Sequence, residues 1–268
     1  MTTASIVIYS SPEKDIRTVV ACAANSSVST IYVIDNAPHD RLKNFVQSLS
    51  KKVVYIQGHG NVGYGAAHNV ALREAVRQNA EYHLVLNPDI EFAEGVIEKL
   101  TEFMNEHRNV GLVMPKVLYP NGDIQYLCKL LPTPADLIFR RFLFFLPGNS
   151  KRTKKYELWN LDYSKIHFGI PSLSGCFMMF RVDTLKQIGG FDERFFMYME
   201  DLDLCRRVHN VAQTAFFPLT TIVHHYKKGS YKSFKLLSYH ILSAFKYFNK
   251  WGWFFDKKRV EINKFSLK

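Results

Sequence analysis

The chain has 268 residues, of which 47% are hydrophobic and 14% aromatic, so it can bury a large core and is not a disordered protein. Its 35 Lys and Arg residues against 24 Asp and Glu residues give a net charge of +11. The excess is local, because residues 227–268 hold 11 basic and 2 acidic residues, and a second cluster comprises Lys151, Arg152, Lys154 and Lys155. The remaining chain is close to neutral, which argues against a nucleic-acid-binding surface.

The cysteines and the apolar runs bound the cellular setting. The chain has four cysteines without the spacing of a zinc site or a disulfide framework, which favours a reducing cytoplasm. The first residues lack a basic region followed by a long apolar core, so we expect a strand there and no signal peptide. The most apolar run elsewhere, 137–146, is interrupted by two arginines and is too short to span a bilayer. We therefore expect no transmembrane helix.

The first half alternates β-rich runs with helical stretches, which is the pattern of a parallel α/β sheet. We expect strands at 5–9, 31–34, 53–56 and 82–86. Helices are expected near 16–25, 41–49, 66–78 and 94–106. Ligands of such sheets lie beyond the carboxyl ends of the strands. The polar groups there should therefore converge on one crevice: Asp35-Asn36, Gly60-Asn61 and Asn87-Pro88-Asp89.

The second half has a different organisation. Residues 120–170 are rich in Pro, aromatic residues and Lys, which predicts an irregular insertion or a mobile loop, and order should resume over 171–226. From 231 to 250 a helical projection separates an apolar arc from a basic one. The apolar arc holds Phe234, Leu237, Ile241, Phe245 and Phe248, and the basic arc holds Lys232, Lys235, Lys246 and Lys250. We predict an amphipathic helix suited to a membrane surface, with an ordinary packed helix as the alternative.

Three polar clusters could carry chemistry. Asp89 follows a strand, where its carboxylate could share a divalent cation with a diphosphate, although Asn-Pro-Asp is also ordinary turn chemistry. Glu200 and Asp201 follow an aromatic run, where one carboxylate could act as a general base or both could simply begin a helix. His224-His225 could place one imidazole on a metal, or both could be structural.

A glycine-rich segment precedes the helix expected near 66–78. Gly63 and Gly65 begin like a dinucleotide-binding fingerprint, but the third glycine is missing and the segment does not follow the first strand. We therefore reject a hydride-transfer enzyme. Together with Gly60, these glycines still allow a ligand to approach the backbone closely, and Asn61 and Asn69 supply side-chain hydrogen bonds.

Together these motifs resemble those of the family 2 glycosyltransferases, which have the GT-A fold. In the first half they are Asp35-Asn36, NVGYGAAHN at 61–69 and LNPD at 86–89. In the second half, GCFMMFR at 175–181 and IGGFDERFFMYMEDLDLCRR at 188–207 are similar to the acceptor-side signature of the rhamnosyltransferase-like branch. The resemblance covers about residues 5–230 and implies one α/β domain, 1–230, with a Rossmann-like, mostly parallel central sheet. Within it, 1–115 would bind the nucleotide sugar and 116–230 the acceptor, and 231–268 would be a helical tail.

The same resemblance implies roles for the matching residues. Asp35 would contact the nucleotide base, and the nucleotide-sugar pocket would also involve Tyr9, Asn61, Gly63, Gly65, Asn69, Asn87 and Asp89. Asp89 stands at the family's metal-binding Asp-x-Asp and would bind Mg²⁺ or Mn²⁺, although Asn87 replaces the first Asp. His224 would be a further metal ligand, with His225 as the alternative. Asp201 would be the general base, with Glu200 as the second choice.

The function implied by the resemblance is an inverting, metal-dependent glycosyl transfer. The first choice of donor is dTDP-L-rhamnose, followed by UDP-glucose, UDP-galactose or UDP-galactofuranose. The acceptor would be a lipid-linked saccharide for O antigen, lipopolysaccharide or capsule. The enzyme would then be cytoplasmic and would contact the inner face of the bacterial cytoplasmic membrane through 231–268. A non-catalytic nucleotide-binding scaffold is the alternative from another class, because Asn87 departs from a paired-Asp metal site.

Overall fold

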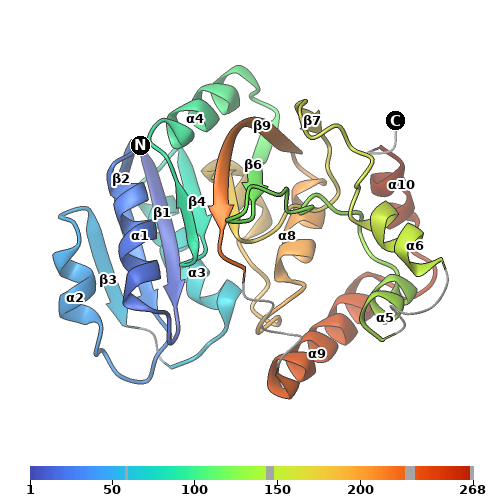
Figure 1. The fold of residues 1–268 in the computed structure, drawn as a ribbon, viewed down its shortest axis with the longest axis horizontal. Coiled ribbons are helices and arrows are strands. Elements are labelled where there is room, and N and C mark those ends of the chain that lie inside the picture. The colour runs from blue at the N-terminus through green and yellow to red at the C-terminus, as the bar shows by residue number, and fades with distance from the viewer. Residues whose placement is uncertain (58–59, 143–147, 227–232, 266–268) are drawn as a thin grey trace.

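In the computed structural model, which describes residues 1–57, 60–142, 148–226 and 233–265, the first half of the chain forms a four-stranded parallel sheet (Figure 1). Its order is β3-β2-β1-β4, made of β1 (Thr2–Ile8), β2 (Val28–Asp35), β3 (Val53–Gln57) and β4 (Tyr82–Leu86). The connecting helices are α1 (Glu13–Ala24), α2 (Lys43–Ser48) and α3 (Tyr64–Arg77). The predicted strands and helices of this half are confirmed.

The carboxyl ends of these strands lie level with one another. Ile8 of β1 lies opposite Asp35 of β2, and Asp35 lies opposite Gln57 of β3. Beyond the strand ends, the side-chain amide of Asn36 donates to the carbonyl oxygen of Gly63 at 3.1 Å. This contact joins the loop after β2 to the loop after β3.

The second half extends the same sheet with strands of both directions. β8 (Phe177–Arg181) lies antiparallel between β4 and β6 (Val110–Leu118), and β9 (Gln213–His224) runs parallel to β6. The short strands β5 (Ile90–Phe92) and β7 (His167–Phe168) pair antiparallel with β9. The sheet is thus parallel in its first half and mixed in its second, a reversal that a buried apolar run does not reveal. Helix α4 (Val96–Glu106), which precedes β6, matches the prediction.

The segment 120–170 contains two helices where we expected irregular structure. They are α5 (Pro134–Phe142) and α6 (Asn149–Tyr156). The Arg152 guanidinium joins them, because its Nε lies 2.7 Å from Asp136 Oδ1 and its centre lies 5.0 Å from the ring centroid of Phe139. The prediction of irregular structure was wrong here because it took proline as a sign of a loop. Pro134 is the first residue of α5, a position where its missing N–H removes no helical hydrogen bond.

Four more helices complete the fold: α7 (Val182–Ile188), α8 (Glu200–Val208), α9 (Phe234–Trp251) and α10 (Lys257–Phe265). Helix α9 is fixed to α8 by buried charges. Lys250 Nζ lies 2.6 Å from Asp203 Oδ1, and Trp251 Nε1 donates to the same oxygen at 2.8 Å. Arg206 forms two hydrogen bonds, of 2.6 and 2.5 Å, with the Asp256 carboxylate. Helices α5, α6, α9 and α10 gather at the end of the molecule opposite α2 and β3 (Figure 1).

The orientation of α9 differs from the predicted arcs. Phe248 is buried inside the protein, and Lys250 forms the ion pair with Asp203 described above. Neither side chain therefore belongs to a surface that faces a membrane, as the predicted arcs had implied. Phe234, Ile241 and Phe245 of the predicted apolar arc are exposed, whereas Lys232 lies outside the described residues. Within the described ranges, none of the helices is long and apolar enough to cross a membrane.

Two histidines, His83 of β4 and His68 of α3, are buried in a chain of side-chain hydrogen bonds. His83 Nδ1 lies 2.8 Å from Thr3 Oγ1, and its Nε2 lies 2.9 Å from Ser5 Oγ. Ser5 Oγ also contacts His68 Nδ1 at 2.7 Å. Burial lowers the pKa of His83 to about 3 and that of His68 well below its usual value. Both imidazoles are therefore neutral in the folded protein at physiological pH.

This burial predicts acid sensitivity. Between pH 6.5 and 3 the unfolded chain binds a proton at His83 that the folded protein excludes, so the free energy of unfolding falls as the pH falls. For His83 alone the loss is about 2 kcal/mol between pH 7 and pH 5. Urea unfolding at these two pH values should show a loss smaller by that amount in His83→Gln. The exposed control His39→Gln should behave like the parent protein, and an unchanged loss in His83→Gln would contradict the assignment.

Candidate active site

The first wall of the site lies at the carboxyl ends of the strands in the parallel first half. Asp35, at the end of β2, is 1% exposed, and its carboxylate accepts hydrogen bonds from the Ala37 amide at 2.8 Å and the Tyr55 hydroxyl at 2.9 Å. Burial and the neighbouring Asp35 raise the pKa of Tyr55, so the phenol stays a donor. Tyr9, after β1, and Asn61 are exposed. Asp35 is therefore buried and held by its neighbours, whereas the side chains of Tyr9 and Asn61 are open to solvent.

Two glycines of the 60–65 segment allow residues of the second half of the chain to pack closely against them. Gly63 has a φ of +93°, and a Cβ there would lie 2.3 Å from the carbonyl oxygen of Phe196. That same oxygen accepts a hydrogen bond from the Tyr64 amide at 2.9 Å. A Cβ on Gly65 would lie 2.8 Å from Cβ of Phe191. The close approach predicted for a ligand is thus made at Gly63 and Gly65 by the protein's own backbone and side chains.

The side chain of Asn69 also forms hydrogen bonds with residues of the second half. Its amide nitrogen donates to the Phe191 carbonyl at 2.8 Å and to Glu193 Oε1 at 2.9 Å, and its oxygen accepts from the Phe191 amide at 2.8 Å. The side chain is buried. These contacts make Asn69 a residue that positions the turn after Gly190, whereas the sequence had indicated a residue of the nucleotide-sugar pocket.

Tyr64 joins the two halves at the centre of the site. Its hydroxyl lies 3.1 Å from Oδ1 of Asn87 and donates to the Gly175 carbonyl at 2.7 Å. The Gly175 amide in turn donates to Asp201 Oδ2 at 3.2 Å. Burial raises the pKa of Tyr64, and the charge of Glu200 adds to the rise, so the hydroxyl keeps its proton. Tyr64 had no predicted role, because a tyrosine inside a glycine motif has no distinctive spacing.

Glu200 and Asp201 begin helix α8 in different environments. The two preceding residues, Tyr198 and Met199, have φ values of +69° and +67°, a strained geometry that recurs at functional sites. Glu200 is buried, and burial together with the Asp201 charge raises the pKa of its carboxyl. Asp201 is partly exposed and accepts a hydrogen bond from the Leu202 amide at 2.8 Å. Of the two, Asp201 is therefore better placed to accept a proton from a ligand.

Asp89 and His224 lie together at the other end of the site. Nε2 of His224 is buried and has no hydrogen-bond partner among the described residues, and it lies 3.4 Å from Asp89 Oδ1. Burial disfavours the charged imidazole, but Cys176 and Asp89 outweigh it and raise the pKa of His224. An imidazole nitrogen beside a carboxylate oxygen is a donor set that suits a divalent transition metal, and Mg²⁺ would use the carboxylate.

Gln125 orients His224. Its amide nitrogen donates to the backbone carbonyl of His224 at 2.7 Å and to that of Leu118 at 3.2 Å, so its oxygen faces His224 Nδ1 at 3.0 Å. In the neutral imidazole the proton therefore sits on Nδ1, and the lone pair of Nε2 points toward Asp89. Such an outer hydrogen bond is usual behind a metal-ligating histidine. No motif in the sequence indicated Gln125.

His225 takes a different direction from His224. Its Nε2 lies 3.6 Å from Glu91 Oε2, and its side chain is 42% exposed. The described part of the chain holds no group of three or more His, Cys, Asp or Glu side chains arranged around one metal position. Asp89 and His224 are therefore the pair among the predicted ligands whose side chains lie together and could hold a cation.

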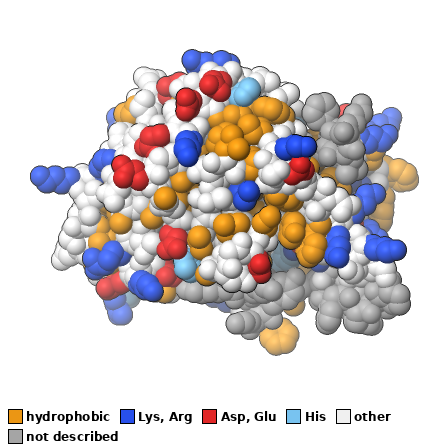
Figure 2. Space-filling model, turned by 45° about the horizontal axis from the view of Figure 1, so that its top comes forward, with side chains coloured by type: hydrophobic (Ala, Val, Ile, Leu, Met, Phe, Trp, Pro, Cys, Tyr) orange, Lys and Arg blue, Asp and Glu red, His pale blue; other side chains and the backbone are white. Residues whose placement is uncertain are grey.

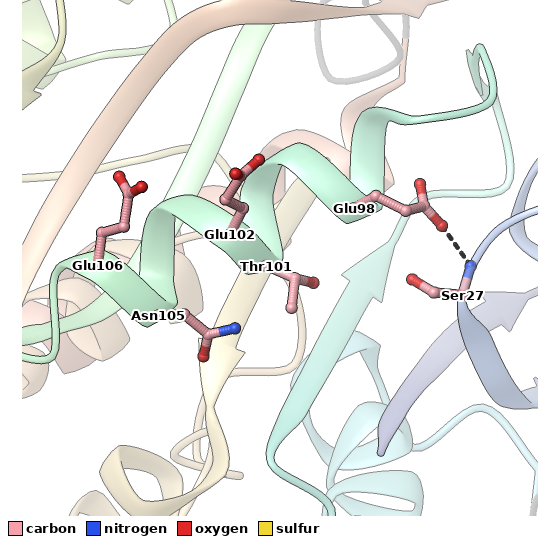
Figure 3. A pocket seen from close by; sticks show the side chains of 6 residues that line it. All are labelled: Ser27, Glu98, Thr101, Glu102, Asn105 and Glu106. Carbon is pink, nitrogen blue, oxygen red and sulfur yellow. Dashed lines mark hydrogen bonds between the residues drawn. The ribbon is translucent and has the colours of Figure 1, made fainter.

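A separate hollow of about 520 Å³ lies on the outer side of α4 (Figure 3). Three glutamates of one helical face, Glu98, Glu102 and Glu106, line it together with Ser27, whose backbone amide donates to Glu98. These carboxylates would repel a diphosphate. The hollow is therefore not a candidate for the donor site.

Solved structures share this fold. The chain superposes on Staphylococcus aureus TarS (residues 1–349) with a TM-score of 0.61 and 17% identity, covering 99% of this chain and 70% of that one. It superposes on the mannosyltransferase PcManGT of Pyrobaculum calidifontis, in complex with GDP-Man and Mn²⁺, with a TM-score of 0.62 and 14% identity, covering 93% and 64%. The fold is therefore that of the GT-A glycosyltransferases.

The sequence profile of glycosyl transferase family 2 matches residues 3–189, and that of the N-terminal domain of galactosyltransferase matches 158–235. The chain belongs to glycosyl transferase family 2. It is 26% identical over 224 residues to the rhamnosyltransferase WbbL of Escherichia coli K12, which covers 81% of each chain.

Two further relatives are longer proteins. The chain is 29% identical over 205 residues to the low-salt glycan biosynthesis hexosyltransferase Agl10 of Haloferax volcanii, covering 75% of this chain and 60% of that one. It is 26% identical over 206 residues to the N-acetylglucosaminyl-diphospho-decaprenol L-rhamnosyltransferase of Mycobacterium tuberculosis H37Rv, covering 73% and 66%. The matches thus span less than two thirds of either relative.

The contact between Gly63 and Phe196 can be tested against a matched glycine. Gly60 also has a positive φ, of +83°, but a Cβ there would meet no atom within 4 Å. Gly60→Ala should cost about 1 kcal/mol of unfolding free energy for its backbone alone. Gly63→Ala should cost at least about 2 kcal/mol more, because the Phe196 backbone must move. Urea unfolding measures both, and equal losses would show that the two halves do not depend on this contact.

Proposed function

We propose that the protein transfers a sugar from a nucleoside diphosphate sugar to a hydroxyl of a saccharide acceptor, with inversion at the anomeric carbon. One observation carries the proposal. The partly exposed carboxylate of Asp201 and the Asp89–His224 pair lie at the carboxyl end of the sheet, linked through Gly175, Tyr64 and Asn87. A single displacement requires a proton acceptor and, for the leaving diphosphate, a group such as the Asp89–His224 pair that can hold a cation.

In this reaction the acceptor oxygen attacks the anomeric carbon while its proton passes to Asp201. The bond between that carbon and the diphosphate oxygen breaks, and the nucleoside diphosphate leaves with the bonding electrons. Glu200 stays neutral beside Asp201, because its raised pKa keeps the proton on its carboxyl group. Tyr64 and Gly175 hold the base in place through the hydrogen bonds described above. No enzyme nucleophile is needed.

Asp89 and His224 would hold Mg²⁺ or Mn²⁺, with Gln125 orienting the imidazole. When bound, the cation supplies charge stabilisation to the departing diphosphate. Asp35, Tyr9 and Asn61 would contact the nucleotide, since they follow the strand ends of the first half.

The choice of substrates follows from the relatives. Two of them are rhamnosyltransferases, and the name of the M. tuberculosis protein specifies a diphospho-decaprenol acceptor. We infer dTDP-L-rhamnose as the donor here, with UDP-glucose, UDP-galactose and UDP-galactofuranose as the next candidates. The acceptor would be a lipid-linked saccharide of bacterial surface polysaccharide assembly.

A lipid-linked acceptor requires a protein surface at the membrane. Exposed apolar side chains on and after α9 include Phe234, Ile241, Leu242, Phe245, Phe254 and Phe255. Basic residues lie beside them, namely Lys235, Lys257 and Lys258, all exposed. Exposed aromatic and basic side chains together suit the interface of an anionic bilayer. We infer that this surface places the enzyme on the cytoplasmic face of the membrane.

Asp201→Asn tests the catalytic assignment. Without a proton acceptor, kcat for transfer from the radiolabelled donor should fall by about 10²- to 10⁴-fold. Nucleotide binding should survive, so dTDP or UDP with Mn²⁺ should raise the melting temperature of the variant as much as that of the parent. The nucleotide that gives the larger shift also identifies the base of the donor.

Two other variants make the outcome decisive. Asp183→Asn removes a carboxylate that is 73% exposed on α7 and should leave kcat unchanged. Glu200→Gln imitates a neutral Glu200, so a larger loss there than in Asp201→Asn would move the base to Glu200. If the parent protein showed a nucleotide-dependent shift but no transfer with any donor, the scaffold alternative would replace the enzyme.

The membrane surface predicts a selective effect of aromatic substitutions. Phe254 and Phe255 are 78% and 99% exposed, so replacing both with Ser should not disturb the core. The double variant should bind vesicles containing phosphatidylglycerol at least about 10-fold more weakly in a sedimentation assay, because two buried rings are lost from the bilayer interface. Leu219→Ser, at a residue 62% exposed on β9, is the control. Equal vesicle binding by all three proteins would exclude this surface.

A further inference from the structure

A second hollow, of about 390 Å³, lies where α5, α6 and α10 meet. Four basic side chains line it: Arg152 and Lys155 from α6, and Arg259 and Lys264 from α10. The two basic clusters of the sequence, near 151–155 and after 227, thus come together on one pocket, although about 100 residues separate them. On the face shown in Figure 2, the charged side chains drawn at this end of the molecule are mostly Lys and Arg.

The charge of the pocket is only partly compensated. Asp136 is the one carboxylate that lines it, and that group is engaged by Arg152 and by the amide and hydroxyl of Thr133. Arg259 is 5% exposed, donates to backbone carbonyls of Pro132 and Phe254 at 3.5 and 3.3 Å, and lies 3.9 Å from Asp256 Oδ2, a carboxylate already bound by Arg206. Lys155 and Lys264 have no ion-pair partner within the described parts of the chain. The pocket therefore offers unpaired positive charge to an anion.

The floor of the pocket is apolar and rigid. Leu131 and Tyr156 are buried there. Asn263 of α10 fixes the backbone of Leu131 in both directions, accepting from its amide at 2.8 Å and donating to its carbonyl at 3.0 Å. At the rim, Val260 is 48% exposed, and the carbonyl that Arg259 holds belongs to the exposed Phe254. An anionic group with an apolar chain attached matches this combination.

Backbone hydrogen bonds connect the wall of the pocket to Asp201. Lys129, two residues from Leu131, pairs with Ser172 through hydrogen bonds of 2.9 Å in both directions, and Gly175 follows three residues later. The Gly175 amide binds Asp201. Leu131 in the pocket wall is thus joined to Asp201 through five residues of backbone and two hydrogen-bonded steps.

We propose that this pocket binds the diphosphate of a prenyl diphosphate-linked acceptor, holding the lipid at the membrane side while the saccharide reaches Asp201. The inference rests on the proposed function for its acceptor. The chemistry recognised is a phosphate ester carrying an apolar chain. Lys155 and Lys264 supply the free charge, Arg259 the buried one, and the apolar rim receives the first part of the chain.

The test compares two double variants with the same loss of charge. Lys155→Ala/Lys264→Ala removes one lysine of the pocket from each of α6 and α10, whereas Lys99→Ala/Lys151→Ala removes two exposed lysines, of α4 and α6, that line neither the pocket nor the inferred membrane surface. Binding of farnesyl diphosphate is measured by titration calorimetry in EDTA and saturating UDP, so that the donor site does not contribute. We expect the pocket variant to bind at least 10-fold more weakly than the parent, and the control within 2-fold.

Further arms separate the possible sources of the phosphate. Inorganic pyrophosphate should bind more weakly than farnesyl diphosphate, and phosphatidylglycerol vesicles should bind the two double variants equally. In transfer assays the pocket variant should show a raised KM for the lipid-linked acceptor, with kcat and the donor KM unchanged. Pyrophosphate binding as tight as that of farnesyl diphosphate, vesicle binding lost only in the pocket variant, or equal farnesyl diphosphate binding by all proteins would overturn the proposal. Failure of the proposed function would appear separately, as the absence of a nucleotide-dependent thermal shift or of transfer from any donor by the parent protein.

Discussion

The close contact between Gly63 and Phe196 is the constraint on which the geometry of the site depends. A parallel sheet brings its own loops to one edge, but it does not fix where a second, mixed half of the chain will face that edge. Here the backbone of Phe196 packs against a glycine with a positive φ and accepts the Tyr64 amide. Four residues later α8 begins with Glu200. The position of Glu200 and Asp201 is thus set by a contact that only glycine permits.

The segment 196–199 also packs against the C-terminal helix α9. The ring of Phe196 lies 4.5 Å from that of Tyr239, and the ring of Tyr198 lies 5.1 Å from that of His240, so α9 packs directly on the strained turn before α8. Asp203 and Arg206 then fix α8 to α9 and to the residue before α10. The helices inferred to meet the membrane are therefore part of the structure that holds the carboxylates in place.

The sequence predicted the first half well because its signals are local. Apolar runs between helical stretches define a parallel sheet, and the polar residues at the strand ends must then meet. Asp89 and His224 were found as types of residue that bind metals, yet their pairing depends on β9 returning to the sheet beside β5. Glu200 and Asp201 were recognised as a pair, but only burial distinguishes the neutral acid from the available base.

Other features have no local signal at all. Gln125, Tyr64 and the pocket between α6 and α10 depend on contacts between residues far apart in the chain, and α5 was hidden by the proline that begins it. The amphipathic pattern of α9 was read correctly as a helix but assigned to the wrong faces in part. Periodicity shows that a helix has an apolar side, whereas buried partners such as Asp203 decide which side the protein takes.

The ion pair between Arg206 and Asp256 has a consequence for synthesis of the chain. The two residues are 50 positions apart, and both side chains are almost fully buried. Until Asp256 is synthesised, the Arg206 guanidinium lacks this carboxylate, and the Trp251 ring against which it packs is also only just made, so the contacts that bury its charge cannot form. The four parallel strands of the first half are complete much earlier in synthesis. The start of α8, with Glu200 and Asp201, is therefore one of the last parts of the site to be fixed.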